Sequence, residues 1–155
     1  MNAYLILKTL HIVSSTLLFG TGLGIAFFKW AVDRSANRAA IRLVAEKVVL
    51  ADWLFTTPAI VVQLTTGLAL SRLLGVPLVS RWLLCALILF CIAGVCWLPV
   101  VALQIRMRNL ARTAERHGEE LSERYWVLAR WWFWLGVAAF TSVLVIFWLM
   151  IVKPP

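Results

Sequence analysis

Apolar residues fill four long stretches of the chain, and short polar connections separate them. The stretches cover about residues 3–28, 51–73, 83–105 and 131–152. Each is close to the roughly 20 residues that an α-helix needs to cross a bilayer. None alternates polar and apolar residues as the strands of a membrane barrel do. The pattern predicts an all-α, polytopic membrane protein with four transmembrane helices in a bundle, forming a single transmembrane domain over residues 1–155.

Composition supports the membrane assignment. Hydrophobic residues make up 63% of the chain and charged residues 14%, whereas soluble domains are about half apolar and a quarter charged. The first stretch lacks a basic start and a small-x-small cleavage pattern, which favours a retained helix over a cleaved signal peptide. The chain has three cysteines, Cys85, Cys91 and Cys96, and no two of them form a C-x-x-C pair. We therefore interpret them as packing residues rather than as a disulfide framework or a zinc site.

Positive charge is concentrated in two of the three connections. Eleven of the fifteen lysines and arginines lie between the first and second stretches or between the third and fourth. Short loops rich in Lys and Arg stay cytoplasmic, which predicts that both termini lie outside. Topology and anionic headgroups therefore account for the net charge of +8, and we expect no nucleic-acid partner.

Both basic connections are predicted to be helical extensions on the cytoplasmic side. The first, about 34–50, has no Gly or Pro. The third stretch should continue over about 106–117, until Gly118 can end the helix. Such extensions either lie on lipid headgroups or dock a partner protein.

Four polar side chains inside the apolar stretches are costly in a bilayer, and an ionisable group there suggests a function. They are Lys8, His11, Asp52 and Gln63. Asp52 and Thr56 are i,i+4 neighbours near the inner end of the second helix, where Asp52 also suits an interfacial position.

His11 is the strongest candidate, at about 10 Å along the first helix from its outer end at 1.5 Å per residue. One stripe of this helix carries a cation, an imidazole, a hydroxyl and a glycine, and it consists of Lys8, His11, Ser15, Leu18 and Gly22. Gly20 and Gly24 lie on the opposite side, which suits close helix packing. A histidine here either ligates haem iron or another metal, relays protons, or hydrogen-bonds a neighbouring helix. The only other histidine, His117, lies on the opposite side of the membrane.

Four segments resemble the HemJ-type protoporphyrinogen oxidase family. YLILKTLHIV is similar to its first-helix Y-x-x-x-K-x-L-H pattern, TTPAIVVQLTTGLAL to its second helix, RWLLCAL to the start of its third, and IVKPP to its C-terminal Val-Lys-Pro. Their order and spacing extend the resemblance over most of the chain. A copper-resistance D-like family also begins with a Leu-His helix, and the chain resembles an uncharacterised group of small predicted integral membrane proteins within this set.

The resemblance implies a haem b site between the first and third helices in the outer half of the bilayer. The family is believed to use its first-helix histidine, which corresponds to His11, together with a third-helix lysine. That lysine corresponds to about Ala86 here. The missing lysine leaves open whether the chain is an enzyme.

Other side chains at the same depth complete the predicted site. Cys85 or Met150 would be a soft second iron ligand, with ordinary packing as the alternative. Lys8 and Arg81 would pair with the haem propionates, or else anchor the chain to headgroups.

We therefore expect a haem b-binding protein of the bacterial inner membrane with an electron-transfer or porphyrin-redox role centred on His11. A non-enzymatic membrane subunit or scaffold, docking a partner through its basic extensions, is the alternative from another class. A metal or small-molecule transporter is a third. Because a bundle this small has little interior, we also expect a homo-oligomer or a subunit of a membrane complex.

Overall fold

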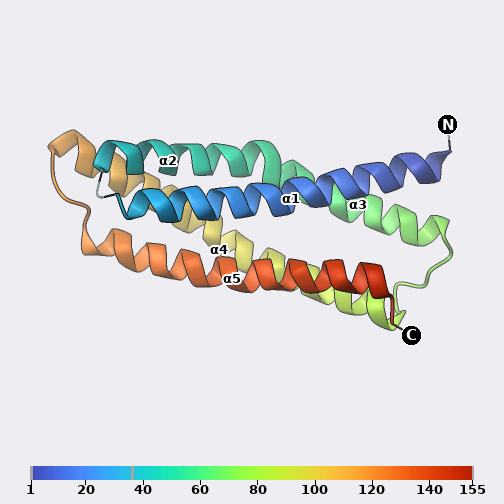
Figure 1. The fold of residues 1–155 in the computed structure, drawn as a ribbon. Helices are drawn as coiled ribbons and strands as arrows, with labels where there is room; N and C mark the ends of the chain where they lie inside the picture. Colours follow the sequence, from blue (N-terminus) through green and yellow to red (C-terminus); the bar gives the residue numbers. More distant parts are fainter. Residues whose placement is uncertain (1, 36, 155) are drawn as a thin grey trace.

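The computed structural model describes residues 2–35 and 37–154, in which every regular element is a helix. The elements are α1 (Ala3–Asp33), α2 (Arg38–Ala51), the π-helical segment η1 (Asp52–Thr56), α3 (Thr57–Leu73), α4 (Arg81–His117) and α5 (Glu123–Val152) (Figure 1). With α2, η1 and α3 taken as one continuous rod, four helices are long and apolar enough to cross a membrane. The predicted all-α class with four membrane-crossing helices is confirmed.

Local sequence explains where the helices begin and end. The side chains of Asn2 and Asn37 accept hydrogen bonds from the backbone N–H groups of Tyr4 and Ala40, at 3.2 and 3.1 Å, and so cap α1 and α2. Gly118 follows α4 with a φ of 67°. This left-handed conformation suits glycine, and the predicted role of Gly118 as a helix stop is confirmed.

A wide turn interrupts the rod just before Pro58. In η1 the N–H of Thr57 donates to the carbonyl of Asp52, five residues back. A proline within a regular α-helix removes one hydrogen bond, and its ring clashes with the carbonyl four residues earlier. The π-turn therefore falls where the helix has to accommodate Pro58.

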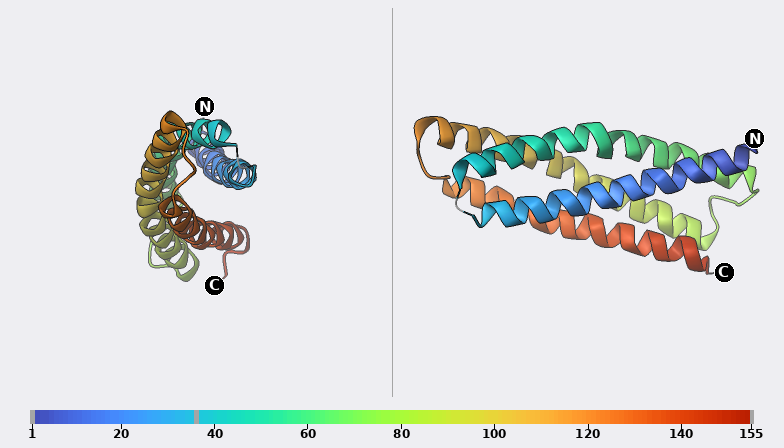
Figure 2. Two further views of the ribbon diagram at one scale, coloured as in Figure 1. Left: turned by 90° about the vertical axis from the view of Figure 1, so that its left-hand side faces the viewer. Right: turned by 45° about the horizontal axis from the view of Figure 1, so that its top comes forward.

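The helices form two pairs that separate toward one end of the bundle. α1 packs on α3, and α4 packs on α5. α4 is inclined, so it lies beside α2 at one end, but α3 and α4 scarcely touch within the described residues (Figure 1). Viewed end-on, the helices follow an open C rather than a closed ring (Figure 2). We call the end with both termini the terminal end, and the opposite end the basic end.

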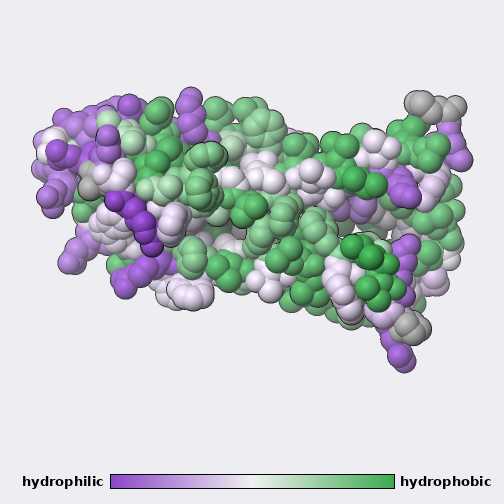
Figure 3. Space-filling view, in the orientation of Figure 1, coloured by the Kyte–Doolittle hydropathy of each residue, from purple (hydrophilic) through white to green (hydrophobic). Residues whose placement is uncertain are grey.

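The buried core is small and is concentrated toward the basic end. Its larger cluster comprises Ile41, Val100, Met107, Ala111, Tyr125 and Trp132. A smaller cluster of Ala86, Ile146 and Leu149 joins α4 to α5 near the terminal end. Apolar side chains also cover the middle of the outer surface, while polar ones gather at the basic end (Figure 3). Such a broad exposed apolar surface suits contact with lipid.

Candidate functional site

His11 of α1 is held against α3 through both of its ring nitrogens. Nδ1 lies 2.9 Å from Thr66 Oγ1, and Nε2 lies 3.0 Å from the amide nitrogen of Gln63. The Thr66 hydroxyl donates to the carbonyl of Val62 at 2.6 Å, so it accepts from His11 Nδ1–H. Nε2 then accepts from the Gln63 amide. The imidazole is therefore neutral, with its proton on Nδ1.

Ser14 completes this cluster from the next turn of α1. Its hydroxyl lies 2.5 Å from Gln63 Oε1 and 3.0 Å from the carbonyl oxygen of His11. The predicted polar stripe named Ser15 instead, but Ser15 donates to the carbonyl of Ile12 in its own helix. That expectation is corrected because α3 lies against the face of α1 that carries positions 11 and 14. We call His11, Ser14, Gln63 and Thr66 the His11 cluster.

Gly67 lets the imidazole lie close to α3. A Cβ at this position would be 3.1 Å from His11 Cε1, which is tighter than an ordinary contact. The predicted close packing at Gly20 and Gly24 is wrong within this chain, since a Cβ at either position would meet only open space. Sequence reasoning noticed Gln63 but missed Thr66 and Gly67. Both residues are three or four positions after Gln63, a spacing that places them on the same face of the helix and could have identified them.

A cleft of about 510 Å³ opens beside His11 at the terminal end, between the two helix pairs. This volume lies within the roughly 300–1,000 Å³ of small-molecule and cofactor sites. Most of its wall is apolar. The polar side chains on the wall are Tyr4, Lys8, His11, Gln63, Ser71 and Lys153.

The predicted second-ligand positions fall into two groups. Met150 and Ala86, the position expected from the resemblance to correspond to the third-helix lysine of the oxidase family, line the same cleft as His11. Cys85 is exposed and is not part of the wall. Of the two candidate soft ligands, Met150 shares the cleft with His11 and Cys85 does not.

The two predicted cationic positions also separate. Lys8 lines the cleft, with its Nζ 5.6 Å from the ring centroid of Tyr4. Arg81 is exposed and is absent from the wall, because α4 turns the face carrying Leu83 and Ala86 toward the cleft. Lys153, just past α5, lines the cleft instead, a role that sequence reasoning missed.

His11 has no partner set of ordinary metal ligands. Within residues 2–35 and 37–154, no three His, Cys, Asp or Glu side chains gather as they would around a metal ion.

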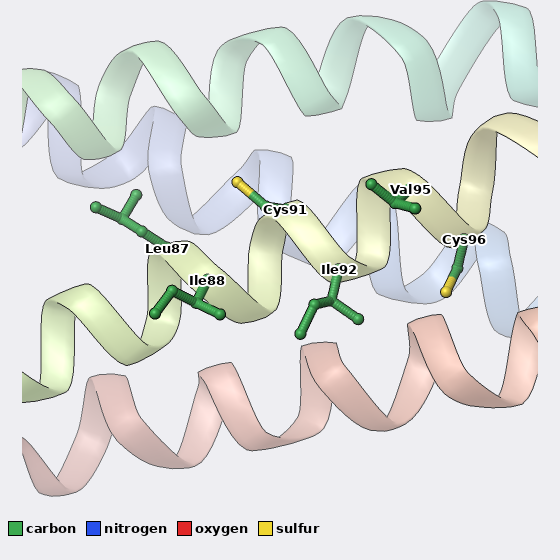
Figure 4. A pocket seen from close by; sticks show the side chains of 6 residues that line it. All are labelled: Leu87, Ile88, Cys91, Ile92, Val95 and Cys96. Atoms are coloured by element: carbon green, nitrogen blue, oxygen red, sulfur yellow. The ribbon is translucent and has the colours of Figure 1, made fainter.

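A second, entirely apolar hollow runs along the surface of α4. Its lining residues are Leu87, Ile88, Cys91, Ile92, Val95 and Cys96 (Figure 4). Cys91 points toward α3 and Cys96 toward α5 (Figure 4), and both are free thiols. The hollow offers no polar group to orient a ligand.

The basic extensions are bound to each other. Glu46 of α2 accepts from Arg112 of α4 at 2.7 Å and from Arg42 at 3.2 Å. Arg42 also forms an ion pair with Glu115 of α4. Part of the basic charge therefore joins α2 to α4, while side chains such as Lys47 remain exposed.

A second buried polar cluster lies toward the basic end of α1. Lys29 Nζ lies 2.5 Å from Asp33 Oδ2 and 3.0 Å from the hydroxyl of Tyr125 on α5, which donates to Asp33 Oδ1 at 2.7 Å. The ammonium group is also 5.4 Å from the centroid of the Trp132 ring, within cation–π range. We call Lys29, Asp33 and Tyr125 the Lys29 cluster.

The comparisons with known proteins define a family but no activity. No curated protein and no solved structure matches the chain. A family model described as "Predicted integral membrane protein" matches residues 5–154, nearly the whole chain. That agrees with the four membrane-crossing helices and with the predicted resemblance to a group of small integral membrane proteins. The chain therefore belongs to the DUF2269 family of predicted integral membrane proteins.

Proposed function

We propose that this protein binds haem b in the terminal-end cleft, where His11 would hold the iron, and has an electron-transfer or porphyrin-redox role. The proposal places it in a bacterial inner membrane with the terminal end outside. One observation carries it: the imidazole at the wall of the cleft has its Nδ1–H fixed on Thr66, 2.9 Å away.

Thr66 prepares His11 for iron in the way that metal-bound histidines usually require. A ligating histidine almost always donates its other ring N–H to an acceptor, which fixes the tautomer and the ring orientation. Thr66 is such an acceptor and is itself anchored on the Val62 carbonyl. Nε2 is then the ligand atom. The Gln63 amide, which hydrogen-bonds Nε2 at 3.0 Å, has to swing to another rotamer to release it.

The rest of the cleft suits a flat apolar group with two acidic substituents. Apolar side chains from all four membrane-crossing helices would contact the macrocycle. Lys8 and Lys153 would pair with the propionates, and Lys153 takes the role that the sequence suggested for Arg81. No acidic side chain competes for them, because every Asp and Glu lies between residues 33 and 52 or between 115 and 123.

Met150 lines the cleft with His11, and its thioether would be the second iron ligand. When bound, the haem supplies one-electron redox chemistry, and His/Met ligation raises its reduction potential. The protein's own residues would orient the imidazole, exclude water from the apolar walls and neutralise the propionates. The lysine of the oxidase family would stand at the position of Ala86, whose small side chain leaves that side of the cleft open.

Hemin titration of the protein purified in mild detergent tests this proposal. The wild type should develop a Soret band that saturates at one haem per chain, and His11→Ala should lose it. His117→Ala is the matched control, because His117 is exposed and lies at the basic end. Imidazole added to His11→Gly should restore part of the band. A wild type without a saturable band, or equal binding by the two alanine variants, would refute the haem site.

A partner-docking scaffold is the second candidate, and the pairing of α2 with α4 favours it. The ion pairs of Glu46 make one rigid unit of both extensions, and Lys47, Arg106 and Arg116 remain exposed on it. This function should survive His11→Ala. It should be lost when these three residues are changed to glutamate, as measured by co-purification of a membrane complex from the native host.

A further inference from the structure

Asp52 lies at the fork where the two helix pairs begin to separate. It is the first residue of η1, between α2, which packs on α4, and α3, which scarcely touches α4 in the described chain. Its side chain is buried, with only 5% of the residue exposed. The hydroxyl of Thr56 donates to Oδ1 at 2.7 Å. Single π-turns of this kind recur at functional sites.

Two acceptor oxygens at this fork have no donor within the described residues. One is Oδ2 of Asp52 and the other is Oε1 of Gln104 on α4. Gln104 is 3% exposed, and its side-chain NH₂ group faces the Asp52 carboxyl group. Buried acceptors without donors are costly and uncommon. Here they come from helices that belong to different pairs.

No cationic side chain in the described residues lies within the 4.0 Å of an ion pair with Asp52. Lys29 on α1 pairs with Asp33, and Glu46 on α2 pairs with Arg42 and Arg112. The other charged groups on the neighbouring stretches of α2, α3 and α4 are exposed or bonded elsewhere: Lys47, Arg72, Arg106 and Arg108. An ionised carboxylate here would be buried and unneutralised, at a large cost.

We propose that Asp52 and Gln104 form a proton-binding site, in which the carboxylic acid donates its Oδ2–H to Gln104 Oε1. A single proton, taken from the aqueous phase, removes the charge and satisfies both bare acceptors. The Gln104 amide turns so that Oε1 rather than its NH₂ group faces the acid. Metal cations such as Ca²⁺ and Mg²⁺ take about six or more oxygen ligands. The site offers only the two carboxyl oxygens, the Thr56 hydroxyl and one amide oxygen.

The proton would join the two helix pairs at their fork. With it, a hydrogen bond from η1 to α4 extends the α2–α4 contact to the edge of the diverging region. Without it, the hydrogen bond can run only the other way, from the Gln104 NH₂ group to a carboxylate whose charge stays buried. The site is independent of the haem proposal, because no residue of the His11 cluster takes part in it.

The chain contains two aspartates, Asp33 and Asp52, which makes a direct measurement possible. Wild-type protein labelled with ¹³C at the aspartate side-chain carboxyl should show two signals at neutral pH, by infrared or NMR spectroscopy. One should be a carboxylate, from Asp33 in its ion pair with Lys29. The other should be a carboxylic acid, absent in Asp52→Asn and retained in Asp33→Asn. Two carboxylate signals in the wild type would overturn the proposal.

Thermal unfolding gives a second test. The amide of Asp52→Asn can donate to Gln104 Oε1 in place of the acid, so its Tm should stay near the wild-type value. Asp52→Ala should unfold several degrees lower, and Gln104→Leu should abolish the difference between the two variants. Equal destabilisation by Asn and Ala would overturn the proposal. So would a Tm that rises with Na⁺ but not with choline and loses this dependence in Asp52→Asn, because a metal cation would then occupy the site.

Discussion

The His11 cluster and the Lys29 cluster both attach α1 to a neighbouring helix through buried polar groups, but only one of them adjoins a cleft. The Lys29 cluster is charged and closed, since an ammonium, a carboxylate and a phenol hydroxyl satisfy one another beneath the Trp132 ring. The His11 cluster is neutral, and its imidazole lines the cleft. The difference indicates that one cluster holds the helices together while the other is also available to a ligand.

The partners explain this difference. Lys29 is buried, and its three polar and aromatic partners leave no room for a fourth. A buried charge keeps its place only while its partners remain. Nε2 of His11 instead meets the end of a glutamine side chain. A long, uncharged side chain can change rotamer at a modest cost, so this bond is the one that a ligand could replace.

The largest expected effect comes from breaking the closed cluster. Lys29→Met should lower the free energy of unfolding by about 3–5 kcal/mol, because it leaves Asp33 without its partner at a largely buried site. Replacing both residues in Lys29→Met/Asp33→Leu should recover most of the loss, since an apolar pair of similar volume often substitutes for a buried ion pair. Unfolding in detergent, followed by circular dichroism, measures both effects.

Lys47→Met is the control for charge removal, because Lys47 is exposed on α2. It should change the unfolding free energy by less than about 0.5 kcal/mol. If the Lys29 and Lys47 variants unfold alike, the Lys29 cluster does not stabilise the bundle, and the contrast between the two clusters disappears.

A smaller effect is expected at the open cluster, where Thr66→Val removes the acceptor of His11 Nδ1–H. Loss of such an orienting partner typically weakens metal binding about 10- to 100-fold, so hemin affinity should fall by that factor. Thr65→Val is the matched control, because the Thr65 hydroxyl is exposed and bonds only carbonyls of its own helix. Equal hemin affinities for the two variants would show that Thr66 does not prepare the imidazole.

Hydropathy was sufficient to predict the four membrane-crossing helices, because transfer into lipid depends on each side chain largely by itself. It misled at Lys29. The apolar run ends at residue 28, so Lys29 was assigned to the first connection, yet α1 continues to Asp33 and buries the lysine. What buries it is Tyr125, 96 residues later. A contact between distant segments leaves no trace in a local pattern.

The sequence likewise predicted some residues of the candidate site and missed others. An imidazole deep in an apolar helix identified His11. The resemblance to the oxidase family pointed to Ala86, and depth in the bilayer suggested Met150; both line the cleft beside His11. The choice of Lys153 over Arg81 depends on how α4 and α5 rotate against each other. That rotation is set by packing, which the periodicity of one helix does not specify.

The smallest predicted effect separates two adjacent serines of the open cluster. Ser14→Ala removes the hydroxyl bonded to Gln63 Oε1 at 2.5 Å, and interhelical polar contacts in membranes contribute about 0.6 kcal/mol on average. We expect a loss of that size in unfolding free energy. Ser15→Ala should cost nothing measurable, because its hydroxyl bonds only the carbonyl of Ile12. Ser14→Ala should also strengthen hemin binding slightly, since a Gln63 amide no longer held by Ser14 leaves Nε2 more readily. Weaker hemin binding in this variant would mean that Gln63 supports the ligand site rather than covering it.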